Sequence, residues 1–244
     1  DVRERLEELE EVTQEFAASF TAGDFRAARG HYVQARVLWD FVRPVAKQFP
    51  DLYAGLGNRR TDLGPQELWT GWHRAEQVLL PAAGDAEVSE AERAQITDAL
   101  LAYTASLVER VGAADFALPT HVMAERATET VGSLAVNNAL GLTDAYSGTD
   151  LWGIYGGVQG SEAVYSALTP VLEGADPAIA SEIEYRLQAT YAELAKHGSV
   201  QSGFAPYSEL SDAEVTALVR TLDALAQALS RLPSEVAHPE VRSP

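Results

Sequence analysis

Apolar residues recur at steps of three and four along almost the whole chain. In the first segment this spacing places Leu6, Leu9, Phe16 and Phe20 on one face of a helix. Later segments repeat the pattern, and no alternation of apolar and polar residues is long enough to build a strand. The periodicity therefore predicts an all-α protein.

Helix start and stop signals divide this pattern into about eight helices of roughly 15–25 residues. Gly23 is expected to end the first helix and Asp24 to cap the second. Ser89 and Glu92 have the spacing of a capping box ahead of a later helix. Mostly short connections favour antiparallel neighbours, so we expect two antiparallel four-helix bundles packed together.

One connection is longer than the others. Residues 50–64 are rich in Gly, Asn and Arg and are predicted to form a loop. Pro65 suits the first turn of the next helix, which is predicted to run through Trp72 to Leu80. We expect one helical domain over residues 1–232, with approximate halves 1–115 and 116–232, and a proline-rich tail over residues 233–244.

Charge and composition exclude several classes of function. The chain has 18 Lys and Arg residues against 36 Asp and Glu, and its net charge of −18 repels nucleic acids and anionic membranes. It has no cysteine, which excludes disulfides, thiolate metal sites and cysteine nucleophiles. No run of about 18 apolar residues is present, so no transmembrane segment is expected. The chain opens on Asp1 without an apolar leader, as a mature secreted product or a trimmed chain would.

The sharpest candidate for chemistry is the run GWHRAE at residues 71–76. On a helix, His73 and Glu76 are three positions apart and point from the same face, so they can share a metal ion. The spacing also fits a plain hydrogen-bonded pair, and it lacks the second histidine of the metalloprotease motif. His31, on the apolar face of the second helix, is expected to be a satisfied core histidine.

Four glycines, at positions 153, 156, 157 and 160, fall within a segment predicted to be helical. Each costs roughly 0.8–1.0 kcal/mol relative to alanine in a helix, so the cluster needs an explanation. One interpretation is close contact between helices. The other is room for a ligand beside Tyr146, Trp152 and Tyr155, and the sequence leaves both open. A phosphate loop is excluded, because neither a preceding strand nor a following Lys-Ser or Lys-Thr is present.

Three longer stretches carry a family resemblance: LWDFVRPVAKQFPDL from Leu38, LWTGWHRAEQVLL from Leu68 and YSGTDLWGIYGGVQGSEAVYSALTP from Tyr146. Together they resemble the imelysin-like family, and within it the EfeO (EfeM) branch of extracytoplasmic iron-uptake proteins. The resemblance implies an all-α pair of four-helix bundles that binds and delivers iron outside the cytoplasm. It also implies a membrane iron permease and a haem peroxidase as partners.

The match to the family motifs is uneven at the acidic positions. His73 and Glu76 fit as they stand, as do Tyr146, Thr149 and Asp150. Asp40 stands where the resemblance implies the first Glu of a Glu-x-x-Glu-Pro run, and Arg43 replaces the second Glu. Other implied Asp, Glu or His positions are occupied by Gly57, Ser133, Gly148 and Gly153.

The arginine at position 43 bears on any metal site that includes Asp40. A unit charge at about 4 Å from another, at an effective dielectric constant of 20, is worth on the order of 4 kcal/mol, and a divalent ion would feel more. A metal ion bound at Asp40 would be repelled by Arg43 to that extent. We therefore expect the carboxylate site that the resemblance implies to be weakened in this chain.

We expect a binding protein rather than an enzyme, located outside the cytoplasm as the resemblance implies. A metal ion, with iron favoured and zinc or copper possible, is predicted to bind His73 and Glu76 with Asp40 or Asp150 as the third ligand. The adjoining ligand pocket is predicted to be lined by Tyr146, Trp152, Tyr155 and Arg43.

Two alternatives stay open from the sequence. The first is a larger ligand such as haem or chelated iron, with His73 as a candidate axial ligand. The second is a zinc-dependent, peptidase-like hydrolase in which Glu76 is a ligand or general base. The hydrolase is the less favoured of the two, because a catalytic zinc ion takes three protein ligands and only two are evident in the sequence.

Overall fold

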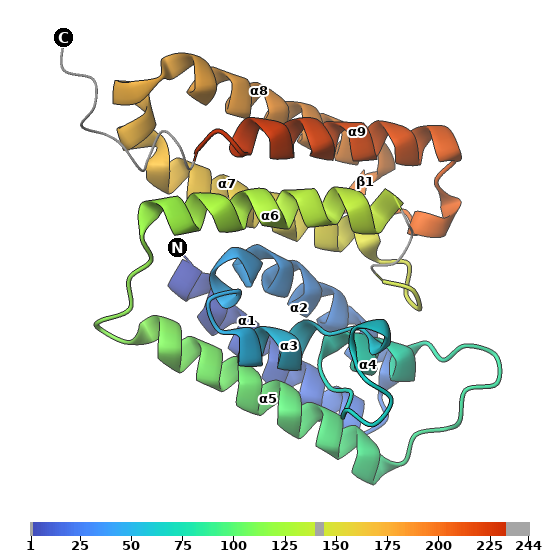
Figure 1. Ribbon diagram of the computed structural model, residues 1–244. Helices are drawn as coiled ribbons and strands as arrows, with labels where there is room; N and C mark the ends of the chain where they lie inside the picture. Colours follow the sequence, from blue (N-terminus) through green and yellow to red (C-terminus); the bar gives the residue numbers. More distant parts are fainter. Residues whose placement is uncertain (1, 140–143, 233–244) are drawn as a thin grey trace.

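Nine α-helices account for most of the chain that the computed structural model describes, residues 2–139 and 144–232 (Figure 1). They are α1 (Val2–Thr21), α2 (Phe25–Ala46), α3 (Pro50–Gly57), α4 (Trp72–Leu79), α5 (Glu90–Gly112), α6 (Thr120–Ala139), α7 (Asp150–Ala175), α8 (Pro177–Leu194) and α9 (Asp212–Leu229). The connections contain three single turns of 3-10 helix and one antiparallel hairpin of β1 (Gly198–Ser199) and β2 (Gly203–Phe204). The prediction of an all-α fold is confirmed.

The first five helices enclose one hydrophobic core. The long helices α1, α2 and α5 pack in one group, and the short helices α3 and α4 complete it (Figure 1). At its centre Trp72 of α4 packs against Phe16 and Tyr32, with ring centroids 5.3 and 6.2 Å apart. All three rings are buried, and burying a large apolar side chain stabilises a fold by about 1.5–3 kcal/mol. This cluster therefore fixes the start of α4 against α1 and α2.

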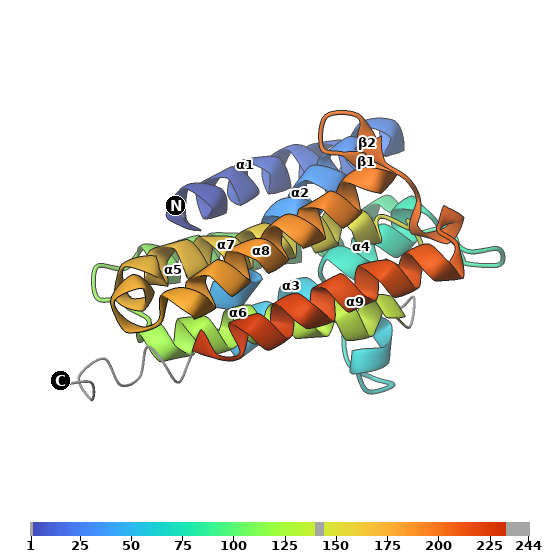
Figure 2. The same cartoon turned by 90° about the horizontal axis from the view of Figure 1, so that it is seen from above.

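The last four helices enclose a second core. Helix α6 packs against α7 and α9, and α8 packs against the same two helices, so the four form a closed ring (Figures 1 and 2). The side chains that fill the ring are mostly aliphatic and include Leu134, Ile154, Val158, Ile183 and Leu222. Non-directional burial of this kind is what the apolar stripes of the sequence favour.

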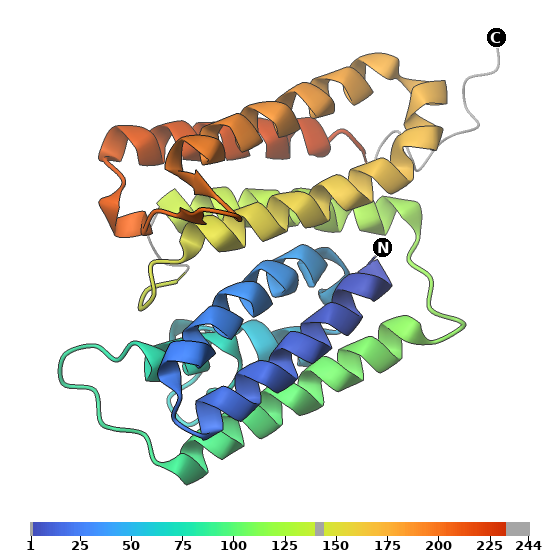
Figure 3. The same cartoon turned by 180° about the vertical axis from the view of Figure 1, so that it is seen from behind.

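The two cores meet where α2 runs beside α7, which is seen from behind in Figure 3. A Cβ atom on Gly156 would lie 2.3 Å from the carbonyl oxygen of Val37, and one on Gly160 would lie 2.1 Å from that of Phe41. Only glycine permits so close an approach of the two backbones. Two of the four clustered glycines therefore serve close contact between helices.

The predicted helix boundaries around position 65 are wrong. Residues Pro50–Gly57, expected in a loop, form α3, and the next helix begins at Trp72 rather than at Pro65. The reason is Gly71, which has a φ of +85° and whose Cβ, if present, would lie 2.4 Å from the carbonyl oxygen of Leu56. This left-handed conformation and tight packing interrupt the backbone before α4 can start.

Two further predictions concern the limits of the domain. The proposed division near residue 115 falls in the connection between α5 and α6, and it stays a prediction. The predicted tail, residues 233–244, lies outside the described residues. Among the helices that are described, none combines the length and apolar content that crossing a membrane requires.

The glycines at the α2–α7 contact provide a stability test. We expect Gly156→Ala and Gly160→Ala each to lower the free energy of unfolding by about 2 kcal/mol or more, because the new methyl group overlaps a backbone carbonyl. The matched control is Gly30→Ala on the exposed face of α2, where a Cβ would meet no atom within 4 Å. That change should stabilise the protein by roughly 0.5–1 kcal/mol. Urea unfolding measures all three variants, and equal effects would contradict the contact.

Candidate metal site

The candidate site is built on α4, whose two faces have different roles. Trp72, Ala75 and Leu79 face the first core, while His73 and Glu76 lie side by side on the face toward the second half of the chain. The Nδ1 atom of His73 lies 3.3 Å from Oε2 of Glu76. The predicted pairing of these side chains on one helical face is therefore present in the structure.

A third metal-ligating side chain, which the sequence did not indicate, comes from the segment that precedes α7. Oδ1 of Asp144 lies 3.8 Å from Nδ1 of His73. Within the described ranges, His73, Glu76 and Asp144 form the group of metal-ligating side chains whose donor atoms all lie within 4.8 Å of one another. Two donor atoms that each lie about 2.1 Å from one ion are at most about 4.2 Å apart. The distances between the three donor atoms would therefore have to shorten by at most about 0.6 Å for all three to bind one ion.

The carboxylate of Glu76 is held in a fixed orientation. Its Oε1 atom accepts hydrogen bonds from the backbone N–H groups of Tyr146 (3.1 Å) and Ser147 (2.8 Å) and from the Ser147 hydroxyl (2.7 Å). These bonds leave Oε2 directed toward His73. Burial raises the pKa of Glu76, but the interactions with His73 and Ser147 outweigh it and hold the pKa below its usual value. The buried carboxylate is thus kept ionised and ready to bind a cation.

Asp144 is held from three directions. Its Oδ1 atom accepts a hydrogen bond from Arg36 at 3.2 Å, and its Oδ2 atom accepts one from the Thr149 hydroxyl at 3.2 Å. Its backbone N–H donates to Oδ1 of Asp150 at 3.1 Å. Burial is the main reason that the pKa of Asp144 is raised. Asp150 therefore positions Asp144, while Asp144 itself faces His73.

Asp40, one of the two predicted third ligands, is occupied by arginines. Its Oδ2 atom lies 3.2 Å from a nitrogen of Arg36, and its Oδ1 atom accepts a hydrogen bond from Arg43 at 2.8 Å. The Cβ of any side chain at Gly153 would come within 2.8 Å of Oδ2, so this glycine leaves room for the carboxylate. Both oxygens lie in ion pairs, although Oδ2 accepts no hydrogen bond from the described residues, and Asp40 lies outside the group of three.

The predicted pocket residues are distributed over separate cavities. Tyr146 lines a cavity of about 250 Å³ that His73 and Glu76 also border. Trp152 and Tyr155 instead line another cavity, of about 280 Å³, and pack against Phe204 with ring centroids 5.1 and 5.9 Å from it. Arg43 lines a third cavity, of about 150 Å³, whose wall also includes His73.

The sequence reasoning missed three residues of this site: Arg36, Asp144 and Ser147. A signal existed for the first, because a buried arginine four positions before Asp40 on the same helix can pair with it. For Asp144 and Ser147 the signal was weaker. Ser147 is the second residue of a stretch that carries the resemblance and Asp144 lies two residues before that stretch, but only the folded chain brings them to α4.

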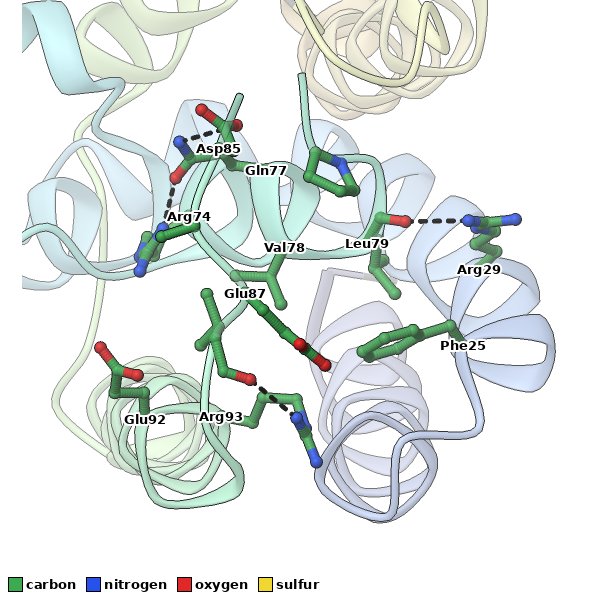
Figure 4. Close-up of a pocket in the computed structure, with 13 residues that line it drawn as sticks. Phe25, Arg29, Arg74, Gln77, Val78, Leu79, Asp85, Glu87, Glu92 and Arg93 are labelled. Atoms are coloured by element: carbon green, nitrogen blue, oxygen red, sulfur yellow. Dashed lines mark hydrogen bonds between the residues drawn. The ribbon is translucent and has the colours of Figure 1, made fainter. Parts of the chain in front are cut away.

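A larger cavity lies on the other side of α4 and is a separate feature. Figure 4 shows its wall, which contains Arg29, Arg74, Gln77 and Arg93 around an apolar floor and encloses about 560 Å³. Its polar groups are largely satisfied: Arg29 donates to the Leu79 carbonyl, Arg93 to the Val88 carbonyl, and Gln77 links Arg74 to Asp85 (Figure 4). We find no group of metal ligands among the residues that line it.

Comparison with known proteins adds independent information. The family model described as imelysin matches residues 1–232. An iron uptake system component EfeM of Pseudomonas syringae is 30% identical over 234 residues, which cover 95% of this chain and 80% of that protein. An iron uptake system component EfeO of Yersinia pseudotuberculosis is also 30% identical over 95% of this chain, but these residues cover 60% of its length. The EfeO of Escherichia coli K12 is 28% identical over 223 residues, which cover 90% of this chain and 57% of that protein.

Asp150 provides a pH test of the site's electrostatics. Burial, and then repulsion by Asp144, raises its pKa to about 7. Between the ordinary pKa near 4 and 7, the folded state holds a proton that the unfolded state has lost, so the folded state loses up to about 1.4 kcal/mol of stability per pH unit as the pH rises. The side chain in Asp150→Asn is neutral at every pH, and its amide oxygen can still accept the hydrogen bond from the backbone N–H of Asp144.

We therefore expect Asp150→Asn to change stability little at pH 4 and to raise the free energy of unfolding at pH 7.5. Urea unfolding at both pH values measures this difference. The control is Asp223→Asn at an exposed position on α9, for which a change below about 0.5 kcal/mol is expected at both pH values. The same effect of Asp150→Asn at pH 4 and 7.5 would contradict the electrostatic account.

Proposed function

Because the chain belongs to the imelysin family, we propose that it binds iron outside the cytoplasm as a component of an iron-uptake system. The observation that carries this proposal is the buried group of His73, Glu76 and Asp144. The chain spans about three fifths of the EfeO relatives and four fifths of the EfeM relative. The activity and partners of a whole protein of that kind are therefore part of the proposal.

The donor set suits iron. Two carboxylates and one imidazole supply the oxygen and nitrogen ligands that iron accepts, and their two negative charges balance a divalent ion. Such a set leaves coordination positions open, and His73 borders two cavities from which water or another ligand can fill them. An ion bound in this way can be exchanged, as a protein that delivers its cargo requires.

Arg36 moderates the affinity of the proposed site. It donates to Oδ1 of Asp144, the same oxygen that lies nearest His73, and therefore competes with a bound cation. A unit charge about 4 Å away is worth on the order of 4 kcal/mol at an effective dielectric constant of 20. This opposition favours reversible binding over tight storage. The sequence led us to expect repulsion of the metal ion by Arg43. In the structure Arg43 pairs with Asp40, and Arg36 is the cation that opposes metal binding.

The rest of the system follows from the resemblance and from charge. Iron would pass from this protein to a membrane permease that works with a haem peroxidase. The net charge of −18 raises the local concentration of cations around the molecule and so assists capture. The acidic surface would thus attract the cation first, and the internal site would then bind it.

The two alternatives find less support. The cavities that border His73, of about 150 and 250 Å³, are smaller than the roughly 300–1,000 Å³ of pockets for drug-sized ligands, which disfavours haem. A zinc hydrolase needs a general base beside its metal ligands. Glu76 and Asp144 would both be ligands, and Asp40 is held by two arginines. A non-enzymatic binding protein is the function that this arrangement supports best.

Metal titration tests the proposal. We expect His73→Ala and the nearly isosteric Asp144→Asn to weaken the binding of iron(II) at least tenfold, because each removes one of three ligands. Competition with a chromophoric chelator under anaerobic conditions measures the affinity, with zinc, copper and manganese tested in parallel.

Two variants act as controls. His31→Ala removes a histidine whose Nδ1 atom lies 3.2 Å from Glu15 on α1, and Asp40→Asn removes the paired carboxylate. We expect His31→Ala to leave the iron affinity within about threefold of the wild type, and Asp40→Asn to weaken it less than Asp144→Asn does, because Asp40→Asn removes compensation of Arg36 but no ligand. Loss of binding in Asp40→Asn but not in Asp144→Asn would assign the third ligand to Asp40. Absence of metal binding in the wild-type protein would refute the proposed function.

A further inference from the structure

The cavity of about 150 Å³ beside His73 is basic, although the protein as a whole is strongly acidic. Four of its lining residues carry a positive charge: Arg36, Arg43, Lys47 and Arg59. Two carry a negative charge, Asp40 and Asp62, so the wall has a formal charge of 4 − 2 = +2. The cavity lies between the two halves of the chain, because its wall includes residues of α2, α4 and α6.

The basic residues of α2 reach this cavity through helical periodicity. Arg36, Asp40, Arg43 and Lys47 follow one another at steps of four, three and four, which places them on a single face. Asp40 contacts both arginines and Arg36 also contacts Asp144, so the three cations of this face have two buried carboxylates between them. The Nε and Nη1 atoms of Arg36 are buried without a hydrogen-bond acceptor among the described residues. The positive charge of this face is therefore only partly compensated.

Arg43 and Lys47 are also largely removed from water. Their side chains are 11% and 15% exposed. The ammonium group of Lys47 lies 3.5 Å from Glu129, whose own side chain is about half exposed. Cations in a small enclosure of low dielectric constant attract an anion more strongly than cations on an open surface do.

The phenol of Tyr53, in the same wall, reports a positive potential. Burial raises its pKa, but the nearby Arg43 and Lys47 outweigh burial and lower it. The pKa of Lys47 is lowered in turn, first by burial and further by repulsion from Arg43. Both directions are those expected in a site that favours negative charge.

We propose that this cavity binds a small carboxylate-type anion, held by Arg43, Lys47 and Arg59, which also coordinates the metal ion at His73. The inference rests on the proposed function, because it supplies a further ligand to the same ion. Arginine and lysine bind carboxylates through charge-assisted hydrogen bonds. The fully buried Arg36 acts through its field and by holding Asp40, since its side chain is only 1% exposed.

The size of the cavity limits the anion. At about 150 Å³ it is smaller than the roughly 300–1,000 Å³ of pockets for drug-sized ligands, which suits an anion the size of oxalate or carbonate. His73 forms part of the wall, so an anion inside can reach an open coordination position of the ion. A bound anion would also offset the positive charge that Arg36 and Arg43 leave beside the metal.

Oxalate binding to the metal-free protein tests the inference directly. We expect calorimetric titration to give a saturable site whose affinity falls at least tenfold in Lys47→Gln and in Arg59→Gln. Arg43→Gln should have a similar effect, but it leaves Asp40 with one partner, so its folding is checked by circular dichroism. The matched control, Arg220→Gln at an exposed position of α9, should bind oxalate as the wild type does. Bicarbonate, in a parallel titration, distinguishes carbonate from organic carboxylates as the source of the anion.

The iron titrations separate this inference from the proposed function. In wild-type protein, oxalate should raise the affinity for iron at least tenfold, and in Lys47→Gln it should not. His73→Ala should lose iron but retain oxalate, whereas Lys47→Gln should retain iron in a carboxylate-free buffer. Equal oxalate affinity in the wild type, Lys47→Gln and Arg59→Gln would overturn the anion site and leave iron binding intact. Oxalate binding without iron binding would overturn the proposed function alone.

Discussion

The guanidinium group of Arg36 lies buried between Asp40 and Asp144, and the arrangement of the site depends on this contact. It joins α2, at the centre of the molecule, to the segment that leads into α7. Removing one partner of a buried ion pair typically costs about 3–5 kcal/mol, because the other charge is left without compensation. A cation is thus fixed at the junction of the two halves. The carboxylates around it must either pair with it or find another positive charge.

The division of the carboxylates follows from that constraint. Asp40 is within reach of both Arg36 and Arg43 and is satisfied by them. Asp144 shares Arg36 but turns the same oxygen toward His73, and Glu76 pairs with His73 while Ser147 holds its other oxygen. Two carboxylates are therefore left to balance a metal ion. The positions where the family resemblance implies acidic residues, such as Gly57 and Ser133, line the basic cavity instead.

The clustered glycines show how one local signal can serve two purposes. Gly156 and Gly160 let the backbones of α7 and α2 approach closely, as one interpretation of the sequence held. Gly153 leaves space for the carboxylate of Asp40, so the same helix that closes the contact also makes room in the site. The aromatic residues of this run do not share one pocket, since Tyr146 borders His73 while Trp152 and Tyr155 pack around Phe204. Tyr146 precedes α7 in the segment that contacts α4, whereas Trp152 and Tyr155 are three positions apart on α7, and this separates them.

Periodicity, caps and composition by themselves determined the helical class, the absence of thiol chemistry and the pairing of His73 with Glu76, because each depends on neighbours within one turn or on composition alone. The bounds of α3 and α4 were not determined in this way, since Gly71 interrupts the chain through a contact with the distant carbonyl of Leu56. The third residue of the candidate metal site was not determined in this way either. Asp144 lies 71 residues from His73 in sequence, and Arg36 lies 108 residues from Asp144. Only the packing of α2 against α7 brings these charges together, and burial then decides which carboxylate is paired and which can bind a metal ion.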